Sequence, residues 1–269
     1  MEAFGAWQLE SLIAVGGLGE VWRANKSGTV AAVKRVHTHL MRNDEIRDQF
    51  AVEAQLATAL PRHPNVVHAH EAGAVNARPF LALELAAGED LRRILSAPAR
   101  PGAAAPSAAP ATVILPRARV IAIVAQACDA VAHLHRYGYA HGDVHPGNLV
   151  VDDEDRVTLV DLGVARRLGA AGAVRGTHAY MAPEQVRGEA WTAATDVFAL
   201  GVVLWELAAG ARLFHRGPPW LTMAAVVEAD ASPLADPALD AIAQVALRKD
   251  PAARLASASE LAALVRAAG

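Results

Sequence analysis

Three side chains that can bind a hard cation lie close together in the sequence between residues 139 and 166. They are Asp143, Asn148 and Asp161. Magnesium prefers a few carboxylate and amide oxygens and keeps much of its water, so the phosphate oxygens of a nucleotide can complete its shell. A hydroxyl substrate needs one more carboxylate to accept its hydrogen bond and proton. We therefore predict that Asp143 is that carboxylate, that Asn148 and Asp161 are metal ligands, and that the reaction is phosphoryl transfer from a nucleotide.

A glycine-rich turn follows the first predicted strand, residues 7–15. Gly16, Gly17 and Gly19 let the backbone turn tightly and bring its N–H groups close to a phosphate. The same turn is equally typical of a hairpin that binds no ligand. Its interpretation therefore depends on residues further along the chain.

A lysine and a glutamate downstream can form an ion pair. Lys34 lies near the end of a short apolar strand predicted over residues 30–37, and most such lysines simply reach solvent. Glu53 borders the apolar stripe of a helix predicted over residues 44–60. An acid in that place is costly without a cation, so we expect Lys34 to be its partner.

Taken together, these residues resemble a protein kinase. The family pattern HRDLxxxN followed by DFG is written here as HGDVHPGN and DLG. The resemblance covers about residues 9–265 and implies an α+β fold, the two-lobed protein kinase fold. It implies a β-rich lobe over residues 1–86 and a larger, mostly helical lobe over residues 87–269. It also implies that ATP and Mg²⁺ bind in the cleft, with Mn²⁺ as an alternative metal.

The resemblance assigns roles to the residues around the nucleotide. Lys34 holds the α- and β-phosphates, Glu53 fixes that lysine, and Leu83 is the gatekeeper before a hinge over residues 84–86 whose backbone meets adenine. The implied nucleotide-contacting residues are Val15, Gly16, Gly17, Gly19, Val21, Ala32, Lys34, Glu53, Leu83, Glu84, Ala86 and Val150.

Later segments continue the resemblance. Residues 182–184, Ala-Pro-Glu, match the end of a kinase activation loop, and Arg254 matches the arginine that pairs with Glu184. A buried helix is predicted over residues 195–210. Asp196 near its start is explained by helix capping, which is compatible with the family role of bonding the catalytic-loop backbone.

Residues 97–116 form a compositional break rich in alanine and proline. Repeated prolines forbid a regular helix, so we predict an exposed, flexible insertion. A linker between unrelated domains is the competing interpretation. It is disfavoured because a helix is predicted to resume over residues 117–136, where the large lobe needs one.

Departures from the family pattern predict how the protein is regulated. Ala14 replaces the first glycine of the glycine-rich loop, and Gly142 replaces the arginine that receives a phosphorylated activation loop. No Ser, Thr or Tyr lies between Asp161 and Gly176. We therefore expect that phosphorylation of this loop does not control activity.

His145 replaces the lysine that steadies the transferred phosphate in Ser/Thr kinases. An imidazole can neutralise that charge only while it is protonated, so we expect the transfer rate to fall as the pH rises through about 7 to 8.5. The alternative is a neutral His145 that merely bonds Thr177. His141 matches the histidine of the HRD motif and is interpreted as structural.

The composition excludes several classes of protein. The 269 residues are 53% hydrophobic, enough for a sizeable core, and the net charge of -3 gives no electrostatic footprint for nucleic acid. No stretch predicts a membrane span or a signal peptide. The single cysteine, Cys128, permits no internal disulfide and suits a reducing compartment, so a cytoplasmic location is expected.

The favoured function is transfer of the γ-phosphate of ATP to Ser or Thr of a protein substrate. Gly176 and Thr177 resemble the Ser/Thr form of the substrate-binding loop, and Thr177 could bond Asp143 and His145. A regulatory partner protein acting in trans is compatible with this function. One alternative is a nucleotide-binding pseudokinase that serves as a signalling interaction module.

A further alternative is a small-molecule phosphotransferase of the aminoglycoside-kinase type. Those enzymes usually have an aspartate where this chain has Gly163, and they lack the Ala-Pro-Glu segment over residues 182–184. A protein is therefore the favoured substrate.

Overall fold

The computed structural model describes residues 2–96, 113–171 and 176–269. By their contacts these residues divide into two compact units. The first unit is Met1–Ala86 with Asp161–Gly163, and the second is Ala87–Val160 with Val164–Gly269. The sequence-based boundary after residue 86 did not anticipate that Asp161–Gly163 would join the first unit. The predicted metal ligand Asp161 is therefore held by the unit that carries Lys34.

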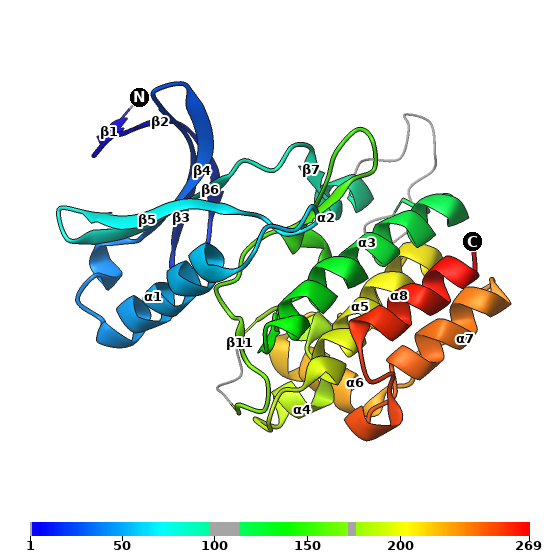
Figure 1. Ribbon diagram of the computed structural model, residues 1–269. Coiled ribbons are helices and arrows are strands. Elements are labelled where there is room, and N and C mark those ends of the chain that lie inside the picture. Colours follow the sequence, from blue (N-terminus) through cyan, green and yellow to red (C-terminus); the bar gives the residue numbers. More distant parts are fainter. Residues whose placement is uncertain (1, 97–112, 172–175) are drawn as a thin grey trace. The chain divides into compact units, whose positions relative to one another are not determined.

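The first unit is built on an antiparallel sheet with the strand order β1-β2-β3-β4-β6-β5 (Figure 1). Its core is formed by apolar side chains that alternate with exposed ones, as expected for a sheet with one covered face, and includes Trp7, Leu9, Val33 and Phe80. The predicted first strand is confirmed, and the second is shifted by one residue. The strands are β1 (Glu2–Phe4), β2 (Trp7–Val15), β3 (Gly19–Lys26), β4 (Thr29–Val36), β5 (Ala69–Val75) and β6 (Arg78–Glu84).

The predicted helix of the first unit is α1, Asp44–Ala59, preceded by a 3₁₀ turn over Thr38–Leu40. The Asn43 side chain caps it by accepting a hydrogen bond from the N–H of Ile46, and acidic residues in the first turn suit the helix dipole. Phe50, Ala54 and Ala57 of the predicted stripe are buried, which orients the helix.

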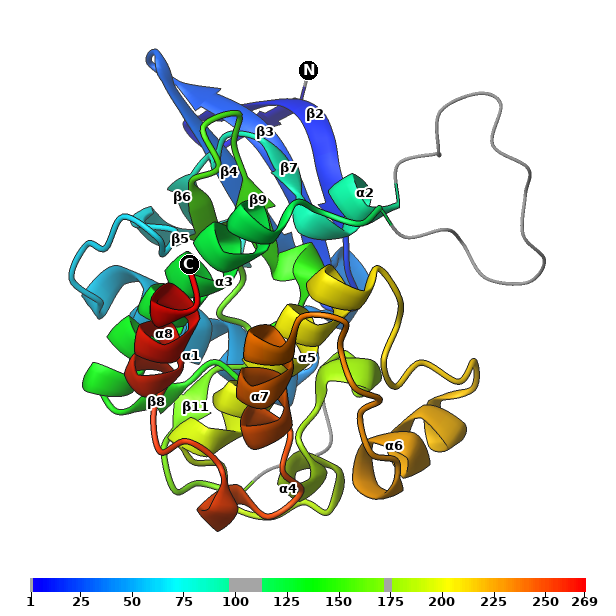
Figure 2. The same ribbon diagram turned by 90° about the vertical axis from the view of Figure 1, so that its right-hand side faces the viewer.

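The second unit is mostly helical, and α3, α5 and α8 pack side by side in it (Figure 2). The apolar face of α3 is buried, and α5 is buried on every side from Ala194 to Leu207, as expected for a central helix. Its helices are α2 (Leu91–Leu95), α3 (Arg117–Arg136), α4 (Pro183–Val186), α5 (Ala193–Ala209), α6 (Pro219–Glu228), α7 (Pro237–Ala246) and α8 (Ala258–Ala267).

Short strands and 3₁₀ turns complete the second unit. The antiparallel hairpin of β9 and β10 directly follows the sequence HGDVHPGN. The strands are β7 (Glu89–Asp90), β8 (Tyr139–Ala140), β9 (Leu149–Val151), β10 (Val157–Leu159) and β11 (Arg166–Arg167), and the 3₁₀ turns are Pro146–Asn148, His178–Tyr180 and Pro251–Ala253.

The predicted insertion ends earlier than expected. Residues 97–112 of it lie outside the described residues, whereas 113–116 are folded against the second unit. The N–H of Val113 donates to the carbonyl of Leu95 at 3.1 Å, and Leu115 is buried. The prediction of an exposed segment is thus wrong for Leu115, because its apolar side chain packs into the core, whereas Ile114 and Pro116 are exposed.

The predicted pair of Glu184 and Arg254 is confirmed. Two parallel contacts of 2.7 and 2.8 Å join the guanidinium to the carboxylate, and the two side chains are 0% and 2% exposed for Arg254 and Glu184. Further guanidinium hydrogens bond backbone carbonyls, including that of Ala194. This pair fastens α4 to the segment between the 3₁₀ turn Pro251–Ala253 and α8.

Cys128 lies on α3 and is fully buried. Burial raises the pKa of its thiol, so the thiolate form is disfavoured. Among the helices of the described residues, we find none with both the length and the apolar character that a membrane span needs.

Candidate active site

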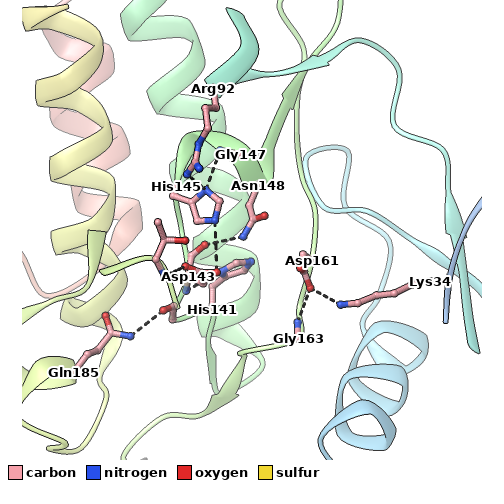
Figure 3. A network of polar contacts seen from close by, with 12 residues as sticks. Lys34, Arg92, His141, Asp143, His145, Gly147, Asn148, Asp161, Gly163 and Gln185 are labelled. Atoms are coloured by element: carbon pink, nitrogen blue, oxygen red, sulfur yellow. Dashed lines mark hydrogen bonds and ion pairs between the residues drawn. The ribbon is translucent and has the colours of Figure 1, made fainter. Parts of the chain in front are cut away.

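Lys34 lies between two carboxylates in the first unit. Its Nζ atom, projecting from β4, is 2.6 Å from Oε1 of Glu53 on α1 and 2.7 Å from Oδ1 of Asp161. Figure 3 shows the contact with Asp161. The predicted ion pair of Lys34 and Glu53 is therefore confirmed.

The three charges differ in their exposure to solvent. The side chains of Lys34 and Glu53 are 12% and 2% exposed, whereas that of Asp161 is 48% exposed. Burial alone lowers the pKa of Lys34, but the neighbouring Asp161 and Glu53 outweigh it and raise the pKa above its ordinary value of 10.5. Burial raises the pKa of Glu53, and Lys34 opposes that shift. The ammonium is thus held charged beside an accessible carboxylate.

The backbone around Asp161 is strained and tightly packed. Asp161 has a φ of 63°, in the left-handed region that few non-glycine residues adopt. Its Oδ1 also accepts the N–H of Gly163 at 3.0 Å, while Gln49 donates to the Gly163 carbonyl. A Cβ on Gly163 would lie 3.0 Å from Oδ1 of Asp161 and Oε2 of Glu53. Strain of this kind is characteristic of functional sites.

Four predicted nucleotide-contacting residues share one face of the sheet in the first unit. Val21 on β3 pairs with Lys34 on β4, and Ala32 on β4 pairs with Leu83 on β6. Paired residues, and residues two apart in a strand, point to the same side. Val21, Ala32, Lys34 and Leu83 therefore line a common surface.

Val15 is not brought to that surface. It pairs with Glu20, whereas Ala14 pairs with Val21, after an irregularity between Leu12 and Ala14. A shift of one residue moves a side chain to the other face of the sheet. Ala14 instead points to the same face of the sheet as Val21. The sequence reasoning had noted Ala14 only as a replacement for the first glycine of the loop.

The glycine-rich turn is closed on itself. The N–H of Gly16 donates to the carbonyl of Gly19 at 2.8 Å, so it is not presented to a phosphate in this conformation. His37, the residue after β4, holds the turn: its Nε2 lies 2.9 Å from the Gly16 carbonyl, and its backbone N–H donates to the carbonyl of Leu18. A ring nitrogen that contacts a carbonyl must carry the hydrogen. Gly17 has open space around it.

The predicted hinge begins at the end of β6. The N–H of Glu84 donates to the carbonyl of His68 at 2.8 Å, and the Glu84 side chain is exposed. Its amide hydrogen is thus used within the first unit and is not available to a ligand. Ala86 is the last residue of this part of the unit.

In the second unit, Asp143 is held through both carboxylate oxygens and its backbone. Oδ1 accepts the N–H of Thr177 at 2.7 Å, and Oδ2 lies 3.6 Å from Nε2 of His145. The Asn148 side-chain amide donates to the Asp143 carbonyl at 3.0 Å (Figure 3). The predicted bond between Thr177 and Asp143 is therefore present, and it is made by the backbone N–H of Thr177.

The environment of Asp143 keeps it ionised. Burial of the carboxylate raises its pKa, but hydrogen bonds from the His145 side chain and the Thr177 backbone outweigh this, so the pKa lies below its ordinary value of 3.8. A carboxylate in this state can accept a hydrogen bond or a proton from a hydroxyl group.

His145 is arranged as a neutral ring. Its Nδ1 accepts the N–H of Gly147 at 2.9 Å, and an Nη2 of Arg92 on α2 lies 3.3 Å from the same atom. Both neighbours are donors, so Nδ1 carries no hydrogen, and Nε2 faces Asp143 as the N–H. The ring nitrogen Nδ1 thus bonds Gly147 and Arg92, and the predicted bond between His145 and Thr177 is not among the contacts of the described residues. Arg92 was missed by the sequence reasoning, which offered no signal beyond a basic residue in a short helix.

A buried acid supports the loop that carries Asp143. The Asp196 carboxylate accepts the N–H groups of His141 and Gly142, both at 2.8 Å, and contacts Nε2 of His135 at 2.8 Å. The capping interpretation is wrong, because α5 begins before Asp196, after Thr192. The family role of bonding the catalytic loop is the one present.

The other predicted residues of the second unit fit around this loop. His141 is fully buried and its Nδ1 accepts the Asp143 N–H at 3.2 Å, in keeping with a structural role. Val150 lies on β9, where it pairs with Asp90 and Thr158.

Comparison with known families agrees with this geometry. The family model described as the protein kinase domain matches residues 7–263. The chain belongs to the protein kinase family. Its two-unit architecture, with a sheet-based first unit and a helical second unit, is the two-lobed α+β fold of that family.

Curated relatives include bacterial serine/threonine-protein kinases. The chain is 33% identical to a probable serine/threonine-protein kinase of Corynebacterium efficiens over 96% of its own length and 40% of the relative's. It is 32% identical to PknA of Mycobacterium tuberculosis, covering 98% of this chain and 61% of the relative. It is likewise 32% identical to PknB of Mycolicibacterium smegmatis, covering 96% and 42%. The chain thus spans about half the length of these relatives.

Proposed function

We propose that the chain is an ATP-dependent protein kinase that phosphorylates Ser or Thr of protein substrates. The observation that carries the proposal is the state of Asp143. Its carboxylate is ionised, accepts the backbone N–H of Thr177 and lies close to His145. A protein that only bound a nucleotide would need no such base. The names of the relatives as serine/threonine-protein kinases support the choice of substrate class.

The first unit supplies the charges for the nucleotide. Lys34, fixed by Glu53, would bind the phosphates, and Asp161 would bind the metal. Asn148 fits as the second metal ligand, because its amide nitrogen is engaged by the Asp143 carbonyl and its oxygen is left for a hard cation. ATP with Mg²⁺, or Mn²⁺ in its place, supplies the transferable phosphoryl group and neutralises its charge.

The second unit positions the acceptor. Asp143 would orient the substrate hydroxyl and take its proton as the bond to phosphorus forms. Nε2 of His145 lies 3.6 Å from the carboxylate of Asp143, and the guanidinium of Arg92 brings a positive charge next to that ring. This cation offsets part of what the lysine would have contributed, which argues against the pseudokinase alternative.

Small-molecule phosphorylation is disfavoured by the packing at Gly163. A Cβ there would lie 3.2 Å from Nζ of Lys34 and closer still to two carboxylate oxygens. An aspartate would crowd this cluster and add a negative charge beside Asp161 and Glu53. A regulatory partner in trans and a cytoplasmic location stay predictions from the sequence.

The deciding experiment is transfer of label from γ-labelled ATP with Mg²⁺, with and without a generic basic protein. We expect label on the protein substrate, and a loss of about 10²-fold or more in Asp143→Asn, because positioning of the hydroxyl is removed. Nucleotide binding, measured by calorimetry, should be unchanged in the variant. Equal labelling by both proteins would refute the assignment of Asp143, and binding without transfer would favour the pseudokinase.

A further inference from the structure

The residue before the catalytic aspartate leaves no room for a side chain. Gly142 has a φ of 76°, and a Cβ on it would lie 2.1 Å from Cζ3 of Trp191. Trp191, between α4 and α5, is fully buried. Its indole ring therefore occupies the space into which an arginine at position 142 would begin to extend.

The same ring also contacts the start of the activation loop. The guanidinium of Arg166 lies over the Trp191 ring, 3.9 Å from its centroid. Arg166 belongs to β11, which pairs with β8 just ahead of the catalytic loop. A guanidinium stacked on a buried indole is a favourable contact, because its positive charge meets the electron-rich face of the ring. The guanidinium is also only weakly hydrated, so little hydration is lost when it stacks.

The backbone of Trp191 completes the attachment. Its carbonyl accepts the N–H of Gly169 at 2.7 Å, and its own N–H donates to the carbonyl of Ala170 at 3.1 Å. Arg166 adds a hydrogen bond to the carbonyl of Ala171 at 3.2 Å. Residues 166–171, the activation-loop start, are thus fastened at several points without any phosphate.

We propose that Trp191 is a positioning residue that anchors the activation-loop start to the loop bearing Asp143. In this arrangement Arg166 and the indole do the work that a phosphate bound by an arginine does in phosphorylation-controlled kinases. The inference rests on the proposed kinase function and gives a physical basis for the expectation that phosphorylation of this loop does not control activity. A tryptophan that merely filled the core would not depend on Arg166.

The test compares two adjacent arginines. Arg166→Gln removes the stacked cation, and Arg167→Gln is the matched control, because Arg167 is exposed and lies 5.2 Å from the Tyr139 ring instead. We expect Arg166→Gln to lower kcat about tenfold, the size of one desolvated cation–π contact, with KM for ATP unchanged. Arg166→Lys should recover part of the rate, and Arg167→Gln should match the wild type.

Hydrogen exchange gives a readout that does not depend on catalysis. The N–H groups of Gly169 and Trp191 should exchange faster in Arg166→Gln than in the wild type, and at the wild-type rate in Arg167→Gln. Wild-type kcat together with wild-type exchange in Arg166→Gln would overturn the anchor. If the wild type transferred no phosphate, the function proposal would fail, and unchanged exchange of Gly169 would still overturn the anchor on its own.

Phosphatase treatment of the freshly purified protein completes the test. Mass spectrometry should show an unphosphorylated activation loop in active enzyme, and treatment should leave kcat unchanged. A large loss of activity traced to Thr177 would overturn the proposal, because the anchor would then be insufficient without a phosphate.

Discussion

Two ion pairs of this chain each contain a buried glutamate, but in only one of them do the two charged groups bond each other exclusively as a pair of side chains. Glu184 and Arg254 satisfy each other through two parallel contacts, and both side chains are shielded from water. Glu53 instead shares Lys34 with the half-exposed Asp161. We call Glu184 with Arg254 the closed pair, because it is shielded from water and its role is structural. We call Lys34, Glu53 and Asp161 the open cluster, because its exposed carboxylate can interact with a charged ligand.

The largest expected effect separates chemistry from stability at the open cluster. Asp161→Ala should lower the transfer rate by about 10²-fold or more, because charge neutralisation supplies much of this catalysis. The free energy of unfolding should change by only about 1 kcal/mol, since the carboxylate is half exposed. Lys34→Met should cause a similar loss of rate. Asp153→Ala, an exposed carboxylate between β9 and β10, is the control in steady-state assays and urea titrations.

Full activity of Asp161→Ala with Mg²⁺ as the only metal would show that the metal-ligand assignment is wrong. A large loss of stability in the same variant would show that the cluster is a structural pair like that of Glu184 and Arg254.

The opposite pattern is expected at the closed pair. Arg254→Met leaves Glu184 buried without its cation and should lower the free energy of unfolding by about 3–5 kcal/mol. Glu184→Leu combined with Arg254→Met should recover part of that loss, because both charges are then removed. Denaturant titration measures the stability of both variants. If the denaturant concentration at the unfolding midpoint were the same in Arg254→Met as in the wild type, the pair of Glu184 and Arg254 would not be more important for stability than the cluster around Lys34.

A smaller effect is expected from the cation next to His145. Arg92→Gln should lower kcat about two- to fivefold, the range for an exposed charge acting near a reacting group. Arg93→Gln is the matched control, since Arg93 is the next residue on α2 and pairs with Asp90 at 3.3 Å. Equal rates in the two variants would mean that Arg92 contributes no charge to the reaction.

The smallest expected effect is none at all. Because Nδ1 of His145 accepts the Gly147 N–H, the single-turnover rate with saturating MgATP should be flat from pH 7 to about 8.5. Asp143 adds no slope, since its depressed pKa leaves it ionised throughout that range. A rate that falls across this range, and rises at pH 8 in His145→Lys, would restore the protonated histidine of the sequence-based prediction.

Local patterns carried most of what the sequence predicted. The helix over 117–136 and the strand over 7–15 have the predicted ends, because apolar spacing and flanking prolines or glycines are local signals. The pairing of Lys34 with Glu53 followed from the cost of burying an acid. Each of these inferences needed only one segment, or one buried charge, to be read correctly.

What the sequence could not supply were contacts set by tertiary packing. Gly142 was interpreted only as a lost arginine. In the structure, the ring of Trp191, 49 positions away in the chain, fills the space next to Gly142. Arg92 meets His145 only because α2 folds against the turn after the catalytic aspartate. Leu115 is buried although its neighbours have the composition of an insertion. None of these contacts has a signature in residue spacing.

The contact between Gly142 and Trp191 also constrains the order in which the sequence can change. An arginine at position 142 and an indole at position 191 exclude each other, because a single Cβ already collides with the ring. A large side chain can enter position 142 only after the tryptophan has been replaced by something smaller, and that first step releases Arg166. If Trp191 anchors the loop as proposed, conversion to a phosphate-controlled enzyme would pass through a less active intermediate, and single substitutions would not easily reach it.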